Sequence, residues 1–64
     1  MRVKRDNVVG MSRRFLRGDD RWGPTEQEFV HNLSMVMDID PDFIRDALRE
    51  AEFLEWVLDM EEVA

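Results

Sequence analysis

The sequence contains no cysteine, no tyrosine and only one histidine. The lack of cysteine excludes disulfides, thiolate nucleophiles and zinc sites built on thiolates. No stretch approaches the ~20 consecutive apolar residues that cross a bilayer, so we expect no membrane partner. The first residues are charged and lead into no apolar segment, unlike a signal peptide. The sequence therefore predicts a cytoplasmic protein.

The chain also offers little material for a core. It has 64 residues, of which 44% are hydrophobic. A domain of this size buries only about 60% of its unfolded surface, and its core rarely supplies more than roughly 3–5 kcal/mol. We therefore expect a single domain over residues 1–64, and an enzyme with a deep pocket is the class least expected.

Charge is abundant but unevenly distributed, with a net charge of −6. Residues 1–22 contain seven basic and three acidic residues, a net charge of +4. Residues 23–64 contain two basic and twelve acidic residues, a net charge of −10. Such an asymmetry is typical of an interaction surface. It is also compatible with two halves that neutralise each other, within the fold or across a dimer.

Hydrophobic spacing predicts an all-α fold, a small three-helix bundle. The first helix is expected over about residues 7–17, with Asp6 as its N-cap and Gly18 as its C-terminal stop. Residues 1–6 would then be a basic arm that need not be ordered. Residues 18–24, which are rich in glycine and charge, are expected to form a loop.

The second and third helices have clear start signals. The second, over about residues 25–37, begins at a capping box that runs from Thr25 to Glu28. The third, over about residues 41–60, begins after Asp40, whose side chain is placed to cap it. Both signals are local, so they predict the helix starts without reference to the rest of the fold.

Apolar residues at helical spacing predict the buried faces. The expected core positions are Val8, Val9, Met11, Phe15, Leu16, Phe29, Val30, Leu33, Val36, Met37, Ile44, Ala47, Leu48, Ala51, Leu54 and Leu58. In the third helix, Phe53, Trp56, Val57 and Met60 widen the apolar face beyond what two partner helices cover. This surplus predicts self-association or a partner protein.

Residues suited to catalysis or metal binding are sparse. His31 has no cysteine and no second histidine to complete a metal site or a nucleophile–base pair. Ser12 and Ser34 have no base within a recognisable motif. We therefore expect no catalytic residue, no metal and no cofactor, and an exposed position for His31 on the second helix.

The third helix carries rows of carboxylates. Like charges four residues apart destabilise a helix by about 0.2–0.5 kcal/mol per pair, so their presence favours a role in binding. The predicted partner-binding carboxylates are Asp42, Asp46, Glu50, Glu52, Glu55 and Asp59. Phe53, Trp56 and Trp22 are the predicted apolar anchors, because large aromatic residues dominate binding hot spots. Trp22 is expected either to cover the core or to be exposed.

These features favour a small acidic non-catalytic interaction protein, an inhibitor or adaptor. Its third helix would bind the basic surface of a protein that handles nucleic acid. In size and acidity the chain is similar to small inhibitors and adaptors of phages and mobile elements. One carboxylate row has about a third of the charge density of duplex DNA, so DNA mimicry would be partial.

Two alternatives remain open. The first is a nucleic-acid-binding regulator that resembles small antitoxins, with a DNA-binding N-terminal part and a protein-binding C-terminal part. Its predicted phosphate contacts are Arg2, Lys4, Arg5, Arg13, Arg14 and Arg17. The second is a homo-oligomeric structural module, in which the basic first helix of one chain packs against the acidic third helix of another.

Overall fold

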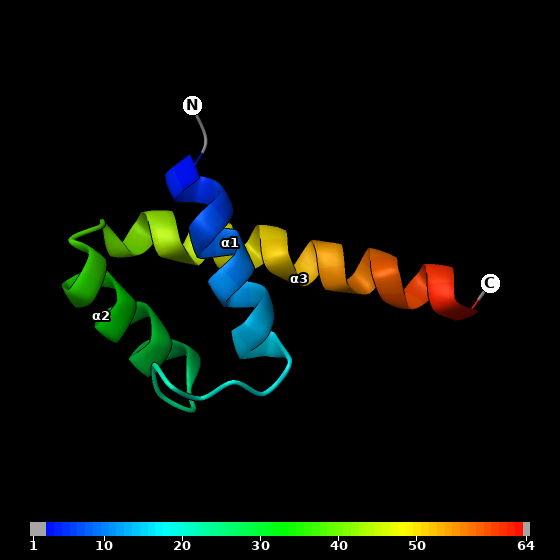
Figure 1. The fold of residues 1–64 in the computed structure, drawn as a ribbon, viewed down its shortest axis with the longest axis horizontal. Coiled ribbons are helices and arrows are strands. Elements are labelled where there is room, and N and C mark those ends of the chain that lie inside the picture. Colours follow the sequence, from blue (N-terminus) through cyan, green and yellow to red (C-terminus); the bar gives the residue numbers. More distant parts are fainter. Residues whose placement is uncertain (1–2, 64) are drawn as a thin grey trace.

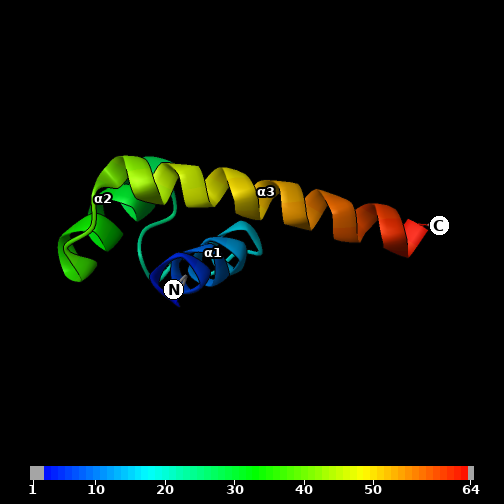
Figure 2. The same cartoon turned by 90° about the horizontal axis from the view of Figure 1, so that it is seen from above.

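The computed structural model describes the backbone of residues 3–63 and the side chains of residues 4–61. Within this range the chain forms three helices, α1 (Val3–Leu16), α2 (Glu26–Met37) and α3 (Pro41–Val63), and no strand. This confirms the predicted all-α three-helix bundle. Figures 1 and 2 show that α1 crosses α3, that α2 lies against the beginning of α3, and that the last turns of α3 project beyond both.

Helix α1 begins earlier than predicted. Its first residue is Val3, and Asp6 lies in its first turn, so the prediction of Asp6 as N-cap is wrong. Residues 4–6, expected in an arm, are therefore helical, whereas residues 1–2 lie outside the described residues. The cause is tertiary, because the side chain of Arg5 is held against α3 by two ion pairs. Asp6 in the first turn also suits the positive end of the helix dipole.

Helix α1 ends at Leu16, and Gly18 forms its C-terminal stop, as predicted. Gly18 has a φ of 108°, and its N–H donates to the carbonyl oxygen of Phe15 at 3.0 Å. The N–H of Asp19 donates to the carbonyl oxygen of Arg14, also at 3.0 Å. These two bonds form a Schellman motif, which favours glycine at the left-handed position.

The predicted caps of α2 and α3 are also present. Thr25 Oγ1 accepts a hydrogen bond from the N–H of Glu28 at 3.2 Å, and Asp40 Oδ1 accepts one from the N–H of Asp42 at 2.8 Å. Between the two helices, Asp38 adopts the left-handed conformation, with a φ of 54°. Its N–H donates to the carbonyl oxygen of Ser34 and so closes α2.

The core lies where the three helices meet. Its buried hydrophobic residues are Val8, Val9, Phe29, Val30, Leu33, Ile39, Ile44, Ala47, Leu48 and Ala51. Phe15 of α1 stacks on Phe29 of α2, with ring centroids 4.5 Å apart. Trp22 packs against this core from the loop and is partly buried.

Two parts of the predicted core are exposed. Val36 is 66% exposed, so its predicted burial is wrong. It lies in the last turn of α2, which Figure 1 shows on the side of the bundle away from α1. Leu16 and Leu58, exposed by 39% and 37%, are also outside the core. Burial in α3 is complete at Ala51 and only partial at Leu54.

Candidate partner-binding helix

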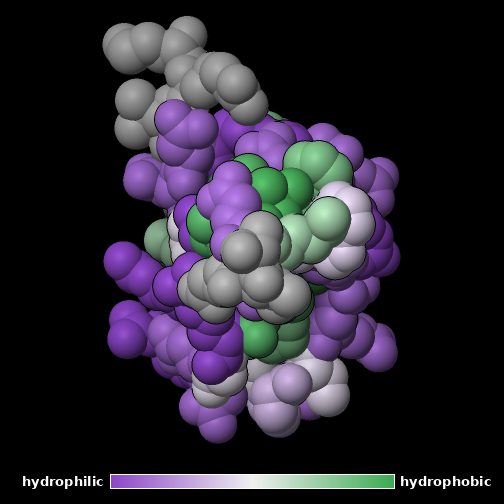
Figure 3. Space-filling model, turned by 90° about the vertical axis from the view of Figure 1, so that its right-hand side faces the viewer, coloured by the Kyte–Doolittle hydropathy of each residue, from purple (hydrophilic) through white to green (hydrophobic). Residues whose placement is uncertain are grey.

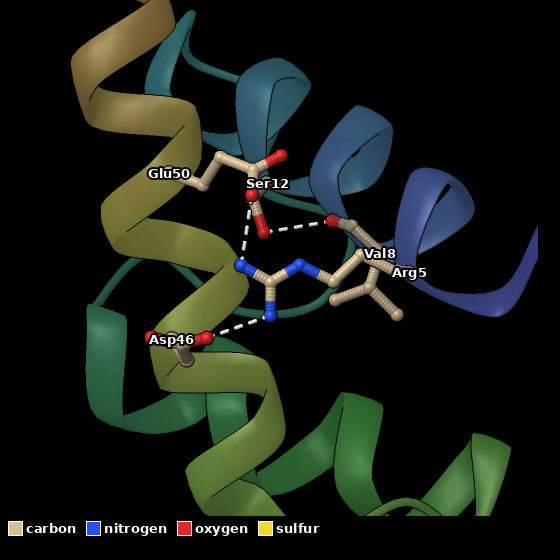
Figure 4. Close-up of polar contacts among 5 residues, drawn as sticks. All are labelled: Arg5, Val8, Ser12, Asp46 and Glu50. Carbon is tan, nitrogen blue, oxygen red and sulfur yellow. Dashed lines mark hydrogen bonds and ion pairs between the residues drawn. The ribbon is translucent and has the colours of Figure 1, made fainter. Parts of the chain in front are cut away.

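The basic helix α1 pairs with the acidic helix α3 within a single chain. Arg5 Nη1 lies 2.7 Å from Asp46 Oδ2, and Arg5 Nη2 lies 2.9 Å from Glu50 Oε1. Figure 4 shows the guanidinium of Arg5 between these two carboxylates. Hydrogen bonds to Glu50 and then Asp46 raise the pKa of Arg5 above its ordinary value. The first half of α3 therefore uses part of its negative charge to hold α1.

A second ionic cluster lies one helical turn beyond the core. Arg13 Nε is 2.8 Å from Glu55 Oε1, and Arg17 Nη2 is 3.2 Å from the same oxygen. The hydrogen bond from Arg13 and, to a smaller extent, that from Arg17 hold the pKa of Glu55 below its ordinary value. This cluster fixes the end of α1 to α3.

The predicted docking carboxylates thus divide into three groups. Asp46, Glu50 and Glu55 are paired with arginines of α1. Two more are paired with arginines on their own helix, Asp42 with Arg45 at 2.8 Å and Glu52 with Arg49 at 2.9 Å. Asp59 is exposed and makes no ion pair with the described side chains.

The predicted phosphate-binding residues do not form one open basic face. Arg5, Arg13 and Arg17 are all directed to carboxylates of α3. Lys4 and Arg14 are exposed and make no ion pair with the described part of the chain. The sixth predicted residue, Arg2, lies outside the described residues.

The distal segment of α3, residues 52–61, carries large apolar side chains in contact with solvent. Phe53, Trp56 and Met60 are 60%, 58% and 53% exposed. The rings of Phe53 and Trp56 lie against each other, with centroids 5.9 Å apart. Figure 3, which faces the end of α3, shows hydrophobic side chains at the surface among hydrophilic ones.

These side chains lie on the side of α3 opposite the core. A helix turns by about 100° per residue, which places Phe53 and Trp56 roughly opposite Ala51, and Ala51 is fully buried. Val57 and Met60 share the direction of Phe53. We call Phe53, Trp56, Val57 and Met60 the outer face of α3. Leu54, in contrast, packs against the core.

Carboxylates border the outer face on both sides. The same rotation places Glu52 and Asp59 along one edge and Glu61 along the other. Asp59 and Glu61 are exposed, and neither is paired with a described basic side chain. The sequence named all four residues of the outer face as surplus apolar residues, and it named Phe53, Trp56 and Asp59 as binding residues, but it missed Glu61. The position of Glu61 one residue after Met60, on the edge opposite Asp59, was the signal that would have found it.

The hydroxyl groups considered for chemistry are engaged by the backbone. Ser12 is fully buried, and its Oγ donates to the carbonyl oxygen of Val8 at 2.8 Å (Figure 4). Ser34 Oγ donates to the carbonyl oxygen of Ile39 at 2.7 Å. His31 is exposed on α2, as predicted. Ser34 and His31 line the same pocket beside the start of α3, but the hydroxyl of Ser34 donates its hydrogen bond to the backbone rather than to the imidazole.

Two searches of the described residues give no further site. They contain no group of three or more histidine, cysteine, aspartate or glutamate residues placed to hold a metal ion. None of their helices combines the length and the apolar character needed to cross a membrane.

Known proteins offer no further guide to this surface. Comparison with protein-family models, curated proteins and solved structures finds no match for the chain. Its function must therefore be argued from the geometry and charge of its own residues, chiefly the outer face of α3 and the carboxylates beside it.

Proposed function

We propose that the chain is a small non-catalytic interaction protein, an inhibitor or adaptor, that binds a positively charged protein through the distal segment of α3. The observation that carries this proposal is the exposure of Phe53, Trp56 and Met60 on the side of α3 away from the core. A contiguous exposed apolar patch rimmed by polar residues marks an interaction site. Aromatic residues and methionine are also enriched in such interfaces.

The charge around the patch favours a basic partner. After Arg49 the sequence contains no basic residue, and Asp59 and Glu61 are exposed beside the outer face. Complementary charge raises association rates and selects partners. Proteins that handle nucleic acid carry strongly basic surfaces, so they are the partner class that this surface suits best.

Docking is expected at the end of α3 rather than along the whole row of carboxylates on this helix. Asp46, Glu50 and Glu55 already bind arginines of α1, so they have less to offer a partner. The nucleic-acid alternative is weakened for the same reason, because three of its proposed phosphate contacts are the arginines of these ion pairs. Phosphate binding would require α1 to give up those contacts.

The test is affinity capture from source-cell lysate, with and without nuclease, using the full chain as bait. We expect one basic protein to be recovered in stoichiometric amount despite nuclease. Asp59→Asn combined with Glu61→Gln should reduce its recovery several-fold, because the two unpaired carboxylates beside the outer face are lost. Higher salt should have the same effect on the unaltered chain.

The matched control is Asp6→Asn combined with Asp20→Asn, which removes the same charge from exposed positions outside α3. Recovery with this control should equal that of the unaltered chain. Recovery that disappears on nuclease treatment would contradict the proposal and favour nucleic-acid binding through α1. An equal loss of recovery in both double variants would mean that recovery depends on net charge alone, and would contradict a specific role for Asp59 and Glu61.

A further inference from the structure

The contact between α1 and α3 shows how a basic helix binds this chain. On the inner side of α3, Ala47 and Ala51 form an apolar strip that is fully buried in the contact with α1. Helical rotation places Glu50 on one edge of this strip and Glu55 on the other. Both carboxylates receive arginines from α1. The inner side is thus an apolar strip with acidic edges that holds an arginine-bearing helix.

The outer face repeats this pattern on the opposite side of α3. Its members lie at positions i, i+3, i+4 and i+7, the spacing of anchors with which one helix contacts another surface. Its edges carry Glu52 and Asp59 on one side and Glu61 on the other. The apolar residues here are larger than the alanines of the inner side. Phe53, Trp56 and Met60 are exposed, and Val57 is partly buried.

We infer that the outer face of α3 receives a basic amphipathic helix of a partner protein, with lysine or arginine on both flanks of its apolar stripe. This inference rests on the proposed function and specifies the shape and chemistry of the partner. Carboxylates on both edges are important, because ion pairs along both edges of a contact between helices set the orientation of the bound helix. The outer face spans about two helical turns, which indicates a small interface.

Other occupants fit this surface less well. The same face of a second copy would bring like carboxylates together along the edges, which is destabilising. An anionic membrane would be repelled, since helices that lie on membranes carry lysine and arginine on the polar face. Nucleic acid would be repelled by the same carboxylates. A basic helix satisfies both the apolar stripe and its acidic edges.

The test uses the full chain, labelled for NMR, and two synthetic probe peptides. One peptide is an amphipathic helix with leucine at heptad spacing and lysine on both flanks, and the other has glutamate in place of lysine. We expect the lysine peptide to shift the amide signals of residues 52–61 and to bind at least tenfold more weakly in high salt. The glutamate peptide should not bind.

Matched apolar variants separate this surface from general hydrophobicity. Phe53→Ala with Trp56→Ala should raise the dissociation constant for the lysine peptide at least tenfold, as expected for central anchors. The control is Met35→Ala with Val36→Ala, which removes side chains that are 71% and 66% exposed on α2, and it should leave the constant unchanged. Circular dichroism checks that each variant keeps its helices.

Several results would overturn the inference. Binding of the glutamate peptide as tightly as the lysine peptide is one, and amide shifts confined to α1 or the loop are another. A third is a dimer, measured by sedimentation, that the Phe53 and Trp56 substitutions dissociate. A captured protein that depends on Asp59 and Glu61, together with a lysine peptide that does not bind, would overturn the helix inference and leave the proposed function intact. Binding of the peptide by a chain that captures no protein would support the inference and contradict the function.

Discussion

The first half of α3, residues 41–51, packs against α1 and α2, whereas the distal segment projects beyond them (Figure 2). In the first half, Ile44, Leu48 and Ala51 are fully buried. In the distal segment, Phe53 and Trp56 are more than half exposed. Both halves contain apolar residues and carboxylates, but only the first half contains basic residues, Arg45 and Arg49. The two halves also differ in how far α1 and α2 cover them.

A similar contrast holds for charge, except that Glu55 at the start of the distal segment is paired with Arg13 and Arg17 of α1. Asp46 and Glu50 in the first half are bound by Arg5, while Asp59 in the distal segment has no ion pair among the described side chains. Position relative to α1, rather than residue type, therefore decides whether a carboxylate of α3 stabilises the fold or is left for binding.

The largest contrast is expected between Leu48→Ala and Trp56→Ala. Loss of the fully buried Leu48 side chain should cost about 2–5 kcal/mol, comparable to what a core of this size supplies in total. Loss of the exposed Trp56 side chain should change the free energy of unfolding by less than about 0.5 kcal/mol. Urea denaturation followed by circular dichroism measures both. A similar cost for the two substitutions would show that the distal segment belongs to the core.

Substitutions at two glycines test the loop and the helix α1, which lie over the first half of α3. Gly23 has a φ of 114°, and a Cβ placed there would lie 2.5 Å from Cβ of Glu28. Gly23→Ala should therefore destabilise the domain by about 1–3 kcal/mol. Gly10, within α1, has open space around such a Cβ, and Gly10→Ala should stabilise by about 0.5–1 kcal/mol. The midpoint of thermal unfolding should fall for Gly23→Ala and rise for Gly10→Ala. A shift of both midpoints in the same direction would contradict this account of the two positions.

The ion pairs of Arg5 should contribute less than the core. Arg5→Gln should lower the midpoint of thermal unfolding slightly, because Asp46 and Glu50 lose their α1 partner, and Lys4→Gln should leave it unchanged. The difference between the two variants should shrink as salt is added. A difference that salt does not alter would mean that Arg5 acts through packing rather than through charge.

The smallest effect is expected from Glu55, at low pH. Arg13 and Arg17 hold the pKa of Glu55 below its ordinary value, so its contribution is present above the unfolded-state pKa and is lost as pH falls through the lower folded-state pKa. The midpoint of unfolding should therefore decline in the acidic range, below the ordinary pKa of glutamate. Glu55→Gln should flatten part of that decline, whereas Asp59→Asn should not. Identical acid profiles for both variants would argue against this role of Glu55.

Local signals in the sequence were sufficient for much of the fold. Thr25, Asp40 and Gly18 act through residues within a few positions of themselves, and each cap was predicted correctly. Asp6 and Val36 were predicted wrongly because their positions depend on tertiary contacts. Arg5 holds the first turn of α1 against α3, and the end of α2 lies away from α1.

The candidate site was only partly predictable for a related reason. Spacing alone gives α3 two apolar sides, one with Ala51 and Leu54 and one with Phe53 and Trp56. Which side is covered depends on where α1 crosses α3, and that crossing is set by contacts between residues about forty positions apart, such as Arg5 with Asp46. The sequence could therefore assign Phe53 and Trp56 to a surplus apolar face, but the ion pairs that use Asp46, Glu50 and Glu55 to hold α1 depend on this crossing and were not predicted.

The most direct measurement is amide hydrogen exchange of the full chain, alone and in complex with the partner recovered by affinity capture. If the distal segment of α3 binds the partner, exchange should slow at residues 52–61 on binding. Exchange along α1 should stay as it is in the chain alone. Slower exchange confined to α1, with no change at residues 52–61, would contradict the assignment of partner binding to the end of α3.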